Sequence, residues 1–376
     1  MQTKALPVIT CPAEPRARGF AHGEGLRNAV RDKIGRWQAA IGEAYGISAD
    51  AFLPRFLGET DFRSSILRFT PDLMQEIDGI ALGAGVDPGL IYALQLMDEE
   101  WWFGRTLADR PSGDGHCSSL AIAPSGGRPT LVGQTMDLPR WHDGAQALLR
   151  LEENDGGESV VFTSAGMVGL MGVTSRGLGV CVNTLSQLAV SPHGLPVACV
   201  MRGALACADV GDAVAFLRRV GHASGQNYQL GDRHCIATLE CSANGVAELD
   251  VADGCSLHTN HPLLSKDHRA GDADLAGSAS SHGRLRSLRE DLRAGAAIDA
   301  MTVMTALSAR KPGGVVAIEP EDPAPITDAM TIGTLLYEIG NEVAVSVCAG
   351  PAGTDTWRRL ELRQGPPASG AQRLRA

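Results

Sequence analysis

Cys117 is the residue whose type and position best suit chemistry. It follows the breaker-rich segment 107–116 and begins a short run typical of a β-strand, residues 118–123. A junction between a loop and a strand leaves a thiol accessible, and a cysteine acts as a nucleophile only when it can be reached and converted to a thiolate. The alternative interpretation is a buried core thiol at the start of a strand. We expect that structural role for the other cysteines, several of which lie inside strand-like or helical runs.

The sequence offers no pattern typical of metal or nucleotide chemistry. It contains no C-x-x-C pair, and His258 and His261 lie three residues apart in an expected loop, with no third ligand evident. Structural zinc sites need four ligands at characteristic spacings. No G-x-G-x-x-G or P-loop motif opens a helix. We therefore expect neither a metal nor an organic cofactor.

Composition and charge argue against several classes of partner. The 376 residues carry 33 Lys and Arg against 43 Asp and Glu, a formal net charge of -10, and 5% are aromatic. Nucleic acids and anionic membranes need cations opposite their phosphates. The most apolar stretch, 160–185, is interrupted by glycines and Arg176, and the N-terminal residues lack the apolar core of a signal peptide. We expect no nucleic acid, no membrane and, from the nine scattered cysteines, a cytoplasmic location.

The elements that would position Cys117 change in character near residue 115. Before it, apolar residues recur at helical spacing, and Thr70 and Pro71 suit a helix N-cap and first helical position. After it, short apolar runs separated by Gly, Asn and Asp are typical of antiparallel hairpins. The expected helices are 18–45, 70 to 83 or 85, 90–100, 196–220 as two helices, 284–293 and 301–309. The expected strands are 118–123, 130–136, 147–151, 159–164, 169–174, 179–183, 228–230, 235–240, 246–251, 331–338 and 343–347. This order predicts an α+β protein with two antiparallel sheets between layers of helices.

The motifs around Cys117 resemble those of one family. Cys117-Ser-Ser-Leu-Ala-Ile and Val132-Gly-Gln-Thr-Met-Asp137 are similar to segments of the isopenicillin-N acyltransferase-like (acyl-coenzyme A:6-aminopenicillanic acid acyltransferase) family of N-terminal-nucleophile hydrolases. Further motifs follow in family order between about residues 14 and 351. They are Arg18-Gly-Phe-Ala-His-Gly-Glu-Gly, the E-x-x-G-I-A-x-G-A-G segment from Glu76, Ser175-Arg-Gly-Leu-Gly-Val-Cys-Val-Asn-Thr-Leu, Asn227-Tyr-Gln-Leu-Gly-Asp, His258-Thr-Asn-His and Ser280-Ser-His-Gly-Arg.

The resemblance implies a four-layer αββα sandwich of the N-terminal-nucleophile hydrolase type and a precursor that cuts itself between His116 and Cys117. Cleavage would leave a mainly helical α chain, 1–116, and a β chain, 117–376, with the nucleophile and most of both sheets, the two together forming one structural domain. The freed α-amine of Cys117 would serve as the base for its own thiol, since such an amine titrates at about 7.7–8.0. Relatives often have glycine before the cysteine, whereas here His116 follows Gly115.

The resemblance also implies roles for five further residues. Asp137 would hold the α-amine, Asn260 would donate to the oxyanion, and Arg284 would favour the thiolate. Asn183 and Tyr228 would bind substrate. The structural alternatives are a turn Asp for Asp137, a loop Asn for Asn260, a solvated helix Arg for Arg284 and a turn Asn for Asn183.

The function expected from this resemblance is that of a self-processing cysteine amidohydrolase or acyltransferase. It would cleave a linear amide of a small N-acyl amino compound through an acyl-enzyme on Cys117, or move an acyl group from a thioester to an amine. Its partners would be a small amide or acyl donor and its own two chains, in a monomer or a homo-oligomer. Three alternatives stay open: an unprocessed Cys/His pair that uses His116, His258 or His261, a catalytically silent binding protein of this fold, and an acidic α+β domain with a chance match.

Overall fold

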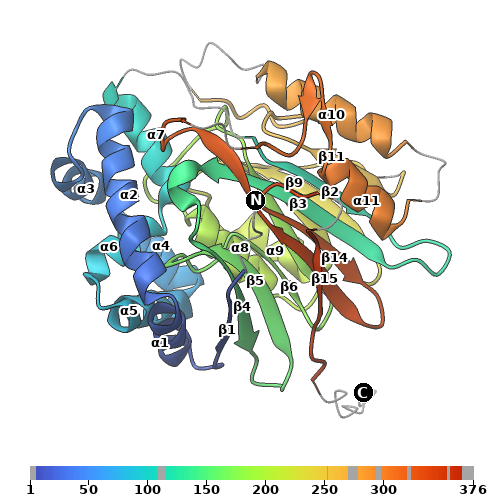
Figure 1. Ribbon diagram of the computed structural model, residues 1–376, viewed down its shortest axis with the longest axis horizontal. Coiled ribbons are helices and arrows are strands. Elements are labelled where there is room, and N and C mark those ends of the chain that lie inside the picture. The colour runs from blue at the N-terminus through green and yellow to red at the C-terminus, as the bar shows by residue number, and fades with distance from the viewer. Residues whose placement is uncertain are drawn as a thin grey trace.

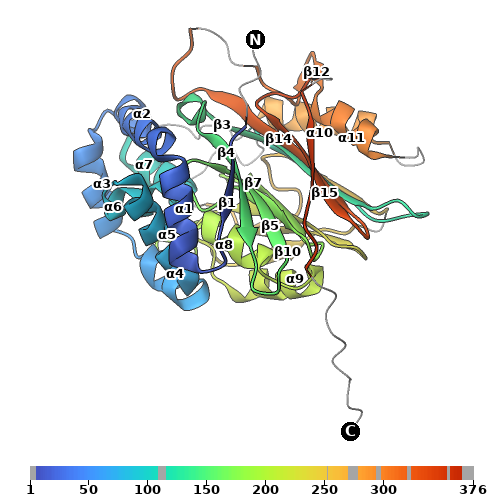
Figure 2. The ribbon, with the colours of Figure 1, turned by 60° about the horizontal axis from the view of Figure 1, so that its bottom comes forward.

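Two β-sheets packed face to face form the centre of the molecule, and helices cover their outer faces (Figures 1 and 2). The structure is a computed structural model that describes residues 6–108, 116–251, 253–269, 278–293, 298–319, 323–353 and 356–365. Helices α8 and α9 lie on one sheet and helices α10 and α11 on the other. They span Val197–Leu205, Val210–Arg219, Ala279–Asp291 and Ala300–Leu307. The predicted four-layer αββα sandwich is confirmed.

The sheets are almost entirely antiparallel. The eight-stranded sheet has the order β1-β4-β5-β6-β7-β8-β9-β10, in which β1 and β4 run parallel. Its strands are Val8–Cys11, Gln146–Glu152, Glu158–Ser164, Met171–Thr174, Gly179–Thr184, Gln226–Gly231, Ile236–Cys241 and Val246–Glu248. The six-stranded sheet has the order β11-β2-β3-β14-β15-β16. Its strands are Cys255–His258, Ser118–Ile122, Thr130–Pro139, Ala329–Ile339, Val343–Ala349 and Arg358–Glu361. A short hairpin joins β12, Arg310–Lys311, to β13, Gly314–Val315.

Central strands are buried along their whole length, because one face meets the other sheet and the opposite face meets helices. Every residue of β5 and of β9 is buried. Strands of this kind carry continuous apolar runs rather than a strict alternation. The sheets approach so closely that a Cβ placed on Gly333 of β14 would lie 2.2 Å from the ring of Phe162 in β5. A glycine is therefore required where that ring crosses the interface.

Seven helices formed by the described residues before Cys117 pack as a group beside the sheets, at the left of Figure 1. They are α1 Pro15–Gly25, α2 Arg27–Tyr45, α3 Ala49–Gly58, α4 Phe62–Phe69, α5 Pro71–Ala84, α6 Pro88–Leu94 and α7 Met97–Ala108. Helix α7 ends this group, and its first turn carries Asp98, Glu99 and Glu100.

Glycines explain two of the sequence motifs. Helices α1 and α5 pack with their backbones in contact, through Gly19 and Gly23 on α1 and Gly79 and Gly83 on α5. A Cβ on Gly19 would lie 1.9 Å from the carbonyl oxygen of Glu76, and one on Gly79 would lie 2.2 Å from that of Arg16. The same contact buries the Glu76 side chain, which pairs with Arg18 and, bidentately, with Arg202 of α8.

Several predicted helix limits were wrong. The helix expected over 18–45 is two helices that break at Leu26, and that expected over 90–100 breaks after Leu94 and then continues to Ala108. Thr70 occupies the N-cap of α5, but its hydroxyl donates back to Ile66 O instead of accepting from the new helix. Helix α10 begins before the expected residue 284, because Ser278 caps it by accepting from Ser281 N.

Short or peripheral strands were not predicted. Strands β1, β11 and β16 have four residues each, and β16 is largely exposed. Their pairing is determined by strands far away in sequence, so local patterning carries little signal for them. The predicted hairpins over 331–347 and around Asn244 are confirmed.

The contact between α1 and α5 predicts an unusually costly Gly→Ala substitution. Gly19→Ala should lower the free energy of unfolding by about 3 kcal/mol or more, because the new methyl group meets backbone atoms that cannot rotate away. Gly35→Ala is the matched control, since Gly35 is exposed in α2 and has nothing within 4 Å of a Cβ. It should stabilise by about 0.5–1 kcal/mol. Urea unfolding of both variants measures the difference, and equal effects would contradict the packing described.

Candidate active site

Cys117 lies at the start of the β2–β3 hairpin and lines a cavity of about 310 Å³. Ser118 is paired with Thr135, which places Cys117 opposite Met136 and Asp137. Its Sγ lies 3.4 Å from Asp137 N, 3.7 Å from Asp137 O and 3.8 Å from Met136 Sδ. The residue is 5% exposed. The hairpin therefore brings Asp137 beside Cys117, as the sequence predicted.

In the uncut chain the thiol of Cys117 is poorly activated. Burial, reinforced by the Asp137 carboxylate, raises the pKa of the Cys117 thiol to about 12, although the Asp137 N–H and the Arg284 guanidinium act in the opposite direction. At neutral pH the sulfur is then a protonated thiol rather than a thiolate. The contacts of this sulfur within the described part of the chain include backbone atoms of Asp137 and the Met136 thioether, neither of which is a base, and a base is needed before the thiol can act as a nucleophile.

The carboxylate of Asp137 is buried with no hydrogen bond of normal geometry to any described residue. Burial raises the pKa of Asp137 to about 7, and Thr331 and Arg284 only partly oppose that shift. A buried acceptor pair without a donor is unfavourable and is uncommon in folded proteins. The Asp137 carboxylate can therefore accept hydrogen bonds from a cationic group next to Cys117.

Arg284 connects Cys117 to Asn260. From helix α10 its Nη1 donates to Cys117 O at 2.6 Å and to Ser118 Oγ at 3.1 Å, while Nη2 donates to Asn260 Oδ1 at 3.1 Å. Because a guanidinium can only donate, this contact establishes which end of the Asn260 amide is oxygen. The Nδ2 end then donates to Thr184 O at 3.0 Å. One N–H of the amide makes no hydrogen bond with the described residues and can serve an oxyanion.

Glu240 organises the segment that carries Asn260, and sequence reasoning missed it. Its buried carboxylate on β9 accepts from His258 Nε2 at 2.8 Å and from the backbone N–H groups of Leu263, Leu264 and Ser265. From the other side, Ser281 Oγ accepts from Asn260 N at 2.9 Å. The available signal was a glutamate inside an apolar strand, because a buried carboxylate must have donors around it.

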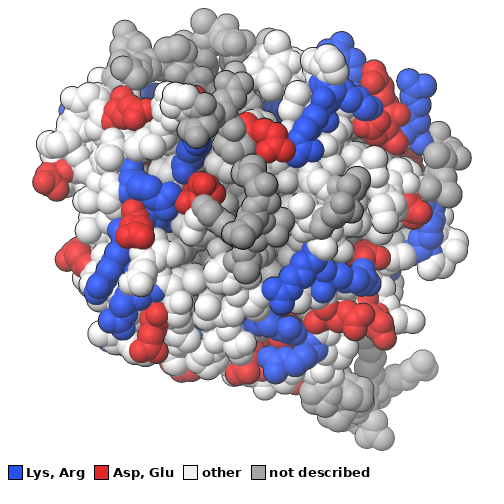
Figure 3. Space-filling view, in the orientation of Figure 1, with Lys and Arg blue, Asp and Glu red and all other residues white. Residues whose placement is uncertain are grey.

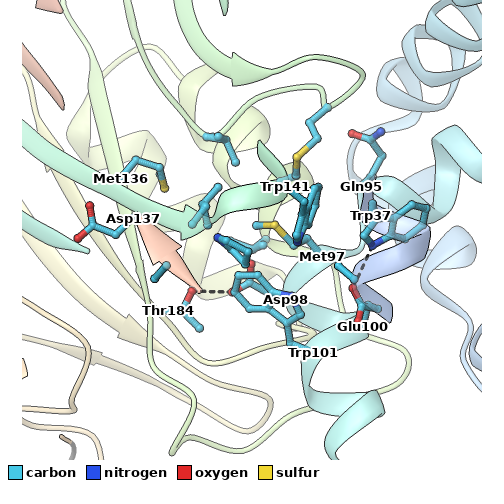
Figure 4. A pocket seen from close by; sticks show the side chains of 18 of the residues that line it. Trp37, Gln95, Met97, Asp98, Glu100, Trp101, Met136, Asp137, Trp141 and Thr184 are labelled. Atoms are coloured by element: carbon cyan, nitrogen blue, oxygen red, sulfur yellow. Dashed lines mark hydrogen bonds between the residues drawn. The ribbon is translucent and has the colours of Figure 1, made fainter. Parts of the chain in front are cut away.

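The cavity beside Cys117 is mostly apolar with a few polar groups. Figure 4 shows Met136 and Asp137 on one side, Trp37 and Glu100 on the other, and Thr184 and Asp98 between them. Its apolar lining includes Ile41, Met97, Trp101, Trp141, Met167, Leu170, Val197 and Met201. Of the aromatic run 101–103, Trp101 lines the cavity and its two neighbours are buried in the core.

Asn183 and Tyr228 do not line this cavity. Asn183 is fully buried between the sheets, where its Oδ1 accepts from Ser119 Oγ and from Asn227 Nδ2. Tyr228 is fully buried on the next strand, with its ring 6.0 Å from that of His222. Their roles in substrate binding stay predictions.

Two of the three histidines of the Cys/His alternative, His258 and His261, are bonded to groups other than Cys117, and a pairing with His116 stays a prediction. His258 bonds to Glu240 and Thr259 O, and His261 bonds to Ser281 and Thr259. The described partners of Cys117 Sγ are Met136 and Asp137. Across the described residues no three His, Cys, Asp or Glu side chains group in the manner of a metal site, and no helix could span a membrane. On the face shown in Figure 3, cations and anions are interspersed.

Comparisons with known proteins agree with the motifs. The family model described as acyl-coenzyme A:6-aminopenicillanic acid acyl-transferase matches residues 125–302. The 40 kDa form of acyl-coenzyme A:6-aminopenicillanic-acid-acyltransferase from Emericella nidulans is 28% identical over 288 residues, 74% of this chain and 76% of that protein. These matches confirm the family resemblance.

Solved structures with a similar chain path are more distant in sequence. Conjugated bile acid hydrolase from Clostridium perfringens aligns with a TM-score of 0.48 and 12% identity over 65% of this chain and 92% of that chain. An N-acylethanolamine-hydrolyzing acid amidase orthologue from Caenorhabditis elegans aligns with a TM-score of 0.42 and 16% identity over 66% of this chain and 100% of that chain.

The unpartnered Asp137 predicts how stability depends on pH in a chain kept uncut by Cys117→Ala. Its folded pKa of about 7 lies above the usual 3.8, so its contribution is fully present below about pH 4 and is lost as the pH rises through 7. Adding Asp137→Asn should leave stability at pH 4 nearly unchanged and raise it at pH 8 by about 2–4 kcal/mol. Denaturant titrations at both pH values test this. Asp32→Asn, at an exposed carboxylate, is the control, and an equal gain there would contradict the assignment.

Proposed function

The chain is a relative of the acyl-coenzyme A:6-aminopenicillanic acid acyl-transferase family, and on that premise we propose that it is a self-processing cysteine amidohydrolase. It would cleave a linear amide of a small N-acyl amino compound through an acyl-enzyme on Cys117. The matching family model and the Emericella nidulans relative are both named as acyltransferases, which supports an enzyme that transfers acyl groups. The nucleophile, the self-cleavage and the substrate are the proposal.

Asp137 is the observation that carries this proposal. Its buried carboxylate has no hydrogen-bond partner among the described residues, and its backbone N–H lies 3.4 Å from Cys117 Sγ. Cleavage before Cys117 would create an α-ammonium group on the residue that Asp137 adjoins. That group would supply the missing donor and the missing positive charge, and its neutral form would supply the base that the thiol lacks.

Self-cleavage would proceed by an acyl shift. The Cys117 sulfur attacks the carbonyl carbon of His116, the S–C bond forms, and the C–N peptide bond breaks with the proton going to the nitrogen that becomes the α-amine. Water then hydrolyses the thioester, which restores the thiol and leaves a carboxylate on His116. Burial of the thiol in the uncut chain raises its pKa to about 12, so we expect this single turnover to be slow.

Turnover of substrate would use the same atoms. The α-amine takes the thiol proton, Sγ attacks the amide carbonyl, and the remaining N–H of Asn260 stabilises the tetrahedral oxyanion. The α-ammonium then gives its proton to the leaving amine as the C–N bond breaks. Water hydrolyses the acyl-enzyme to a carboxylic acid. Arg284 would act as a positioning residue, because it holds Asn260 Oδ1 and Cys117 O at once.

The two proposed chains would stay together after the cut. Strand β1 of residues 1–116 pairs with β4 of residues 117–376, and Glu76 pairs with Arg202 across the same division. Trp37, Met97 and Trp101 from the first part line the cavity that contains Cys117 from the second. One structural domain made of both chains is therefore the arrangement that these contacts favour.

Acyl transfer is the second candidate. The relative from Emericella nidulans is named as an acyltransferase. In that reaction the acyl donor is a thioester, and an amine takes the place of water at the acyl-enzyme. All nine cysteines are free in the structure, which favours a reducing compartment such as the cytoplasm for either reaction.

Intact-mass analysis under denaturing conditions tests self-processing. The wild-type chain should give two pieces of about 12 and 27 kDa, in proportion to 116 and 260 residues of the 39.4 kDa chain, whereas Cys117→Ala should give a single 39.4 kDa species. Cys235→Ser removes an exposed cysteine and should be cut like wild type. A single species in wild type and in both variants would refute the self-processing mechanism.

Asn260→Ala tests the oxyanion role. Loss of one such donor should lower kcat by about 10²–10³ with a much smaller change in KM, because the contact forms only as negative charge develops. Only the cleaved fraction is assayed, so that slower processing does not contribute to the result. Asn154→Ala, at an exposed turn, is the control. A change in KM alone would assign Asn260 to substrate binding instead.

A further inference from the structure

The cavity has an acidic side that the proposed reaction does not use. Asp98, Glu99 and Glu100 are consecutive in the first turn of α7, and all three are buried. Asp98 and Glu100 line the cavity, whereas Glu99 faces away from it and accepts from Val197 N and Ser224 Oγ. Neither lining carboxylate contacts Cys117. Their presence in a mostly apolar cavity therefore needs a reason other than the proposed chemistry.

One carboxylate oxygen of Asp98 accepts hydrogen bonds from described residues, and the other does not. Its Oδ1 accepts from Thr184 Oγ1 at 2.6 Å and from Gln226 Nε2 at 2.9 Å. Its Oδ2 makes no hydrogen bond with the described residues, and the residue is 6% exposed. Figure 4 shows Asp98 at the cavity with its bond to Thr184. A ligand that enters the cavity thus meets a carboxylate oxygen that can still accept.

Gln226 supplies a second, independent indication. It lines the cavity and is 1% exposed. Its Nε2 donates to Asp98 and to Ser224 Oγ at 3.1 Å, so the orientation of the amide is determined by those acceptors. The other end, Oε1, is buried with no partner among the described residues. An unpartnered acceptor next to a half-satisfied carboxylate calls for a ligand that donates hydrogen bonds.

The charged residues that line the cavity indicate whether the hydrogen-bond donor on the ligand is neutral or cationic. The described charged residues that line the cavity are Asp98, Glu100, Asp137 and Arg105. The α-ammonium proposed at Cys117 balances Asp137, which leaves two carboxylates against one guanidinium. Burial raises the pKa of Glu100 to about 7 and that of Asp98 above its usual range, although Arg105 partly opposes both shifts. One positive charge on a ligand would complete the balance.

The walls beside Asp98 suit the hydrocarbon part of such a ligand. Met97, Trp101 and Trp141 line the same cavity, whose volume of about 310 Å³ is that of a small-molecule site. Aromatic faces attract ammonium groups and also bind alkyl chains. Thr184 connects this side to the proposed reaction centre, because its hydroxyl donates to Asp98 and its carbonyl accepts from Asn260.

We propose that Asp98 binds a protonated amine of the substrate, and that the enzyme therefore acts on amides that carry a single positive charge. The reaction part of this statement rests on the proposed function, but the binding of the cation does not, because the open acceptors of Asp98 and Gln226 are present in the uncut chain. Gln226 accepts a second hydrogen bond from the same ammonium group or from the amide beside it. A neutral hydroxyl could satisfy these acceptors but not the charge.

Binding to uncut protein tests the site without any chemistry. In the Cys117→Ala chain, n-pentylammonium should bind about 10- to 100-fold more tightly than 1-pentanol by calorimetry or NMR titration, as expected for a hydrogen bond to a charged group. Asp98→Asn should abolish that preference, since it keeps the shape and removes the charge. Glu100→Gln should weaken it less. Exposed Asp32→Asn is the control and should change nothing.

Two results would overturn the proposal. Equal affinity for the ammonium and the alcohol would show that the charge is not recognised, and this comparison needs no variant at Asp98. A preference that survives both Asp98→Asn and Glu100→Gln would place the cation elsewhere. Circular dichroism of each variant confirms that the folded chain is being measured.

Matched amides then identify which part of the substrate carries the charge. One pair is 4-aminobutanoyl and pentanoyl p-nitroanilide, which differ by an ammonium group in the acyl part. The other is the pentanoyl amide of 1,4-diaminobutane and of pentylamine, which differ in the leaving amine. At least one cationic member should have a kcat/KM about tenfold or more above its neutral partner, and Asp98→Asn should remove the difference.

These assays separate the two proposals. If wild-type protein is not cut and hydrolyses nothing but still prefers the ammonium ligand, and Asp98→Asn abolishes that preference, the proposed function fails and the cation site stands. If it is cut and turns over the neutral amides as well as the cationic ones, the proposed function stands and the cation site fails.

Discussion

The buried guanidinium of Arg284 is the contact on which the site depends. It joins three segments that are distant in sequence: the hairpin that begins at Cys117, the segment that carries Asn260, and helix α10. A cation that is 1% exposed is tolerated only when acceptors replace its hydration. Its acceptors include a backbone carbonyl, a hydroxyl and an amide oxygen. The same guanidinium acts to lower the pKa of the Cys117 thiol and determines the orientation of the Asn260 amide.

Some buried carboxylates of this molecule are surrounded by hydrogen-bond donors, and others keep oxygens without a donor among the described residues. Glu76 meets Arg18 and Arg202, and although burial opposes its ionisation, these arginines hold the pKa of Glu76 below its usual range. Glu240 is likewise surrounded by donors. Asp137 and Asp98 are buried with acceptors to spare. Glu76 and Glu240 stabilise the fold, whereas Asp137 and Asp98 lower the free energy of unfolding. Buried carboxylates without donors are expected at sites that bind a further group.

The sequence predicted the layers, the hairpin and the central group of the site, because these depend on local signals. Breaker residues before Cys117 and an Asp at the end of the second strand are enough to bring Asp137 to the sulfur. Asn260 and Arg284 came from family motifs, since nothing local shows that a loop and a helix more than 140 residues after Cys117 meet it. Glu240 and Asp98 were missed because their importance lies in partners from other strands. Asn183 and Tyr228 were expected to bind substrate, but both are fully buried and do not line the cavity. The sequence could not show this, because their burial depends on how the sheets and helices pack together.

The position of the proposed cut follows from how the two halves are anchored. Helix α7 ends at Ala108 and β2 begins at Ser118, so the bond before Cys117 lies between two elements that are each held by their own contacts. On one side, α7 is fixed through Asp98 to Thr184 and Gln226 and through Glu100 to Trp37. On the other side, β2 is paired with β3 and β11. A break there would leave the contacts named for both anchors in place, and the new terminus would lie beside Asp137, whose carboxylate has no hydrogen-bond donor among the described residues. The fold can therefore be complete before the site is, and the chemistry that completes the site need not disturb the fold.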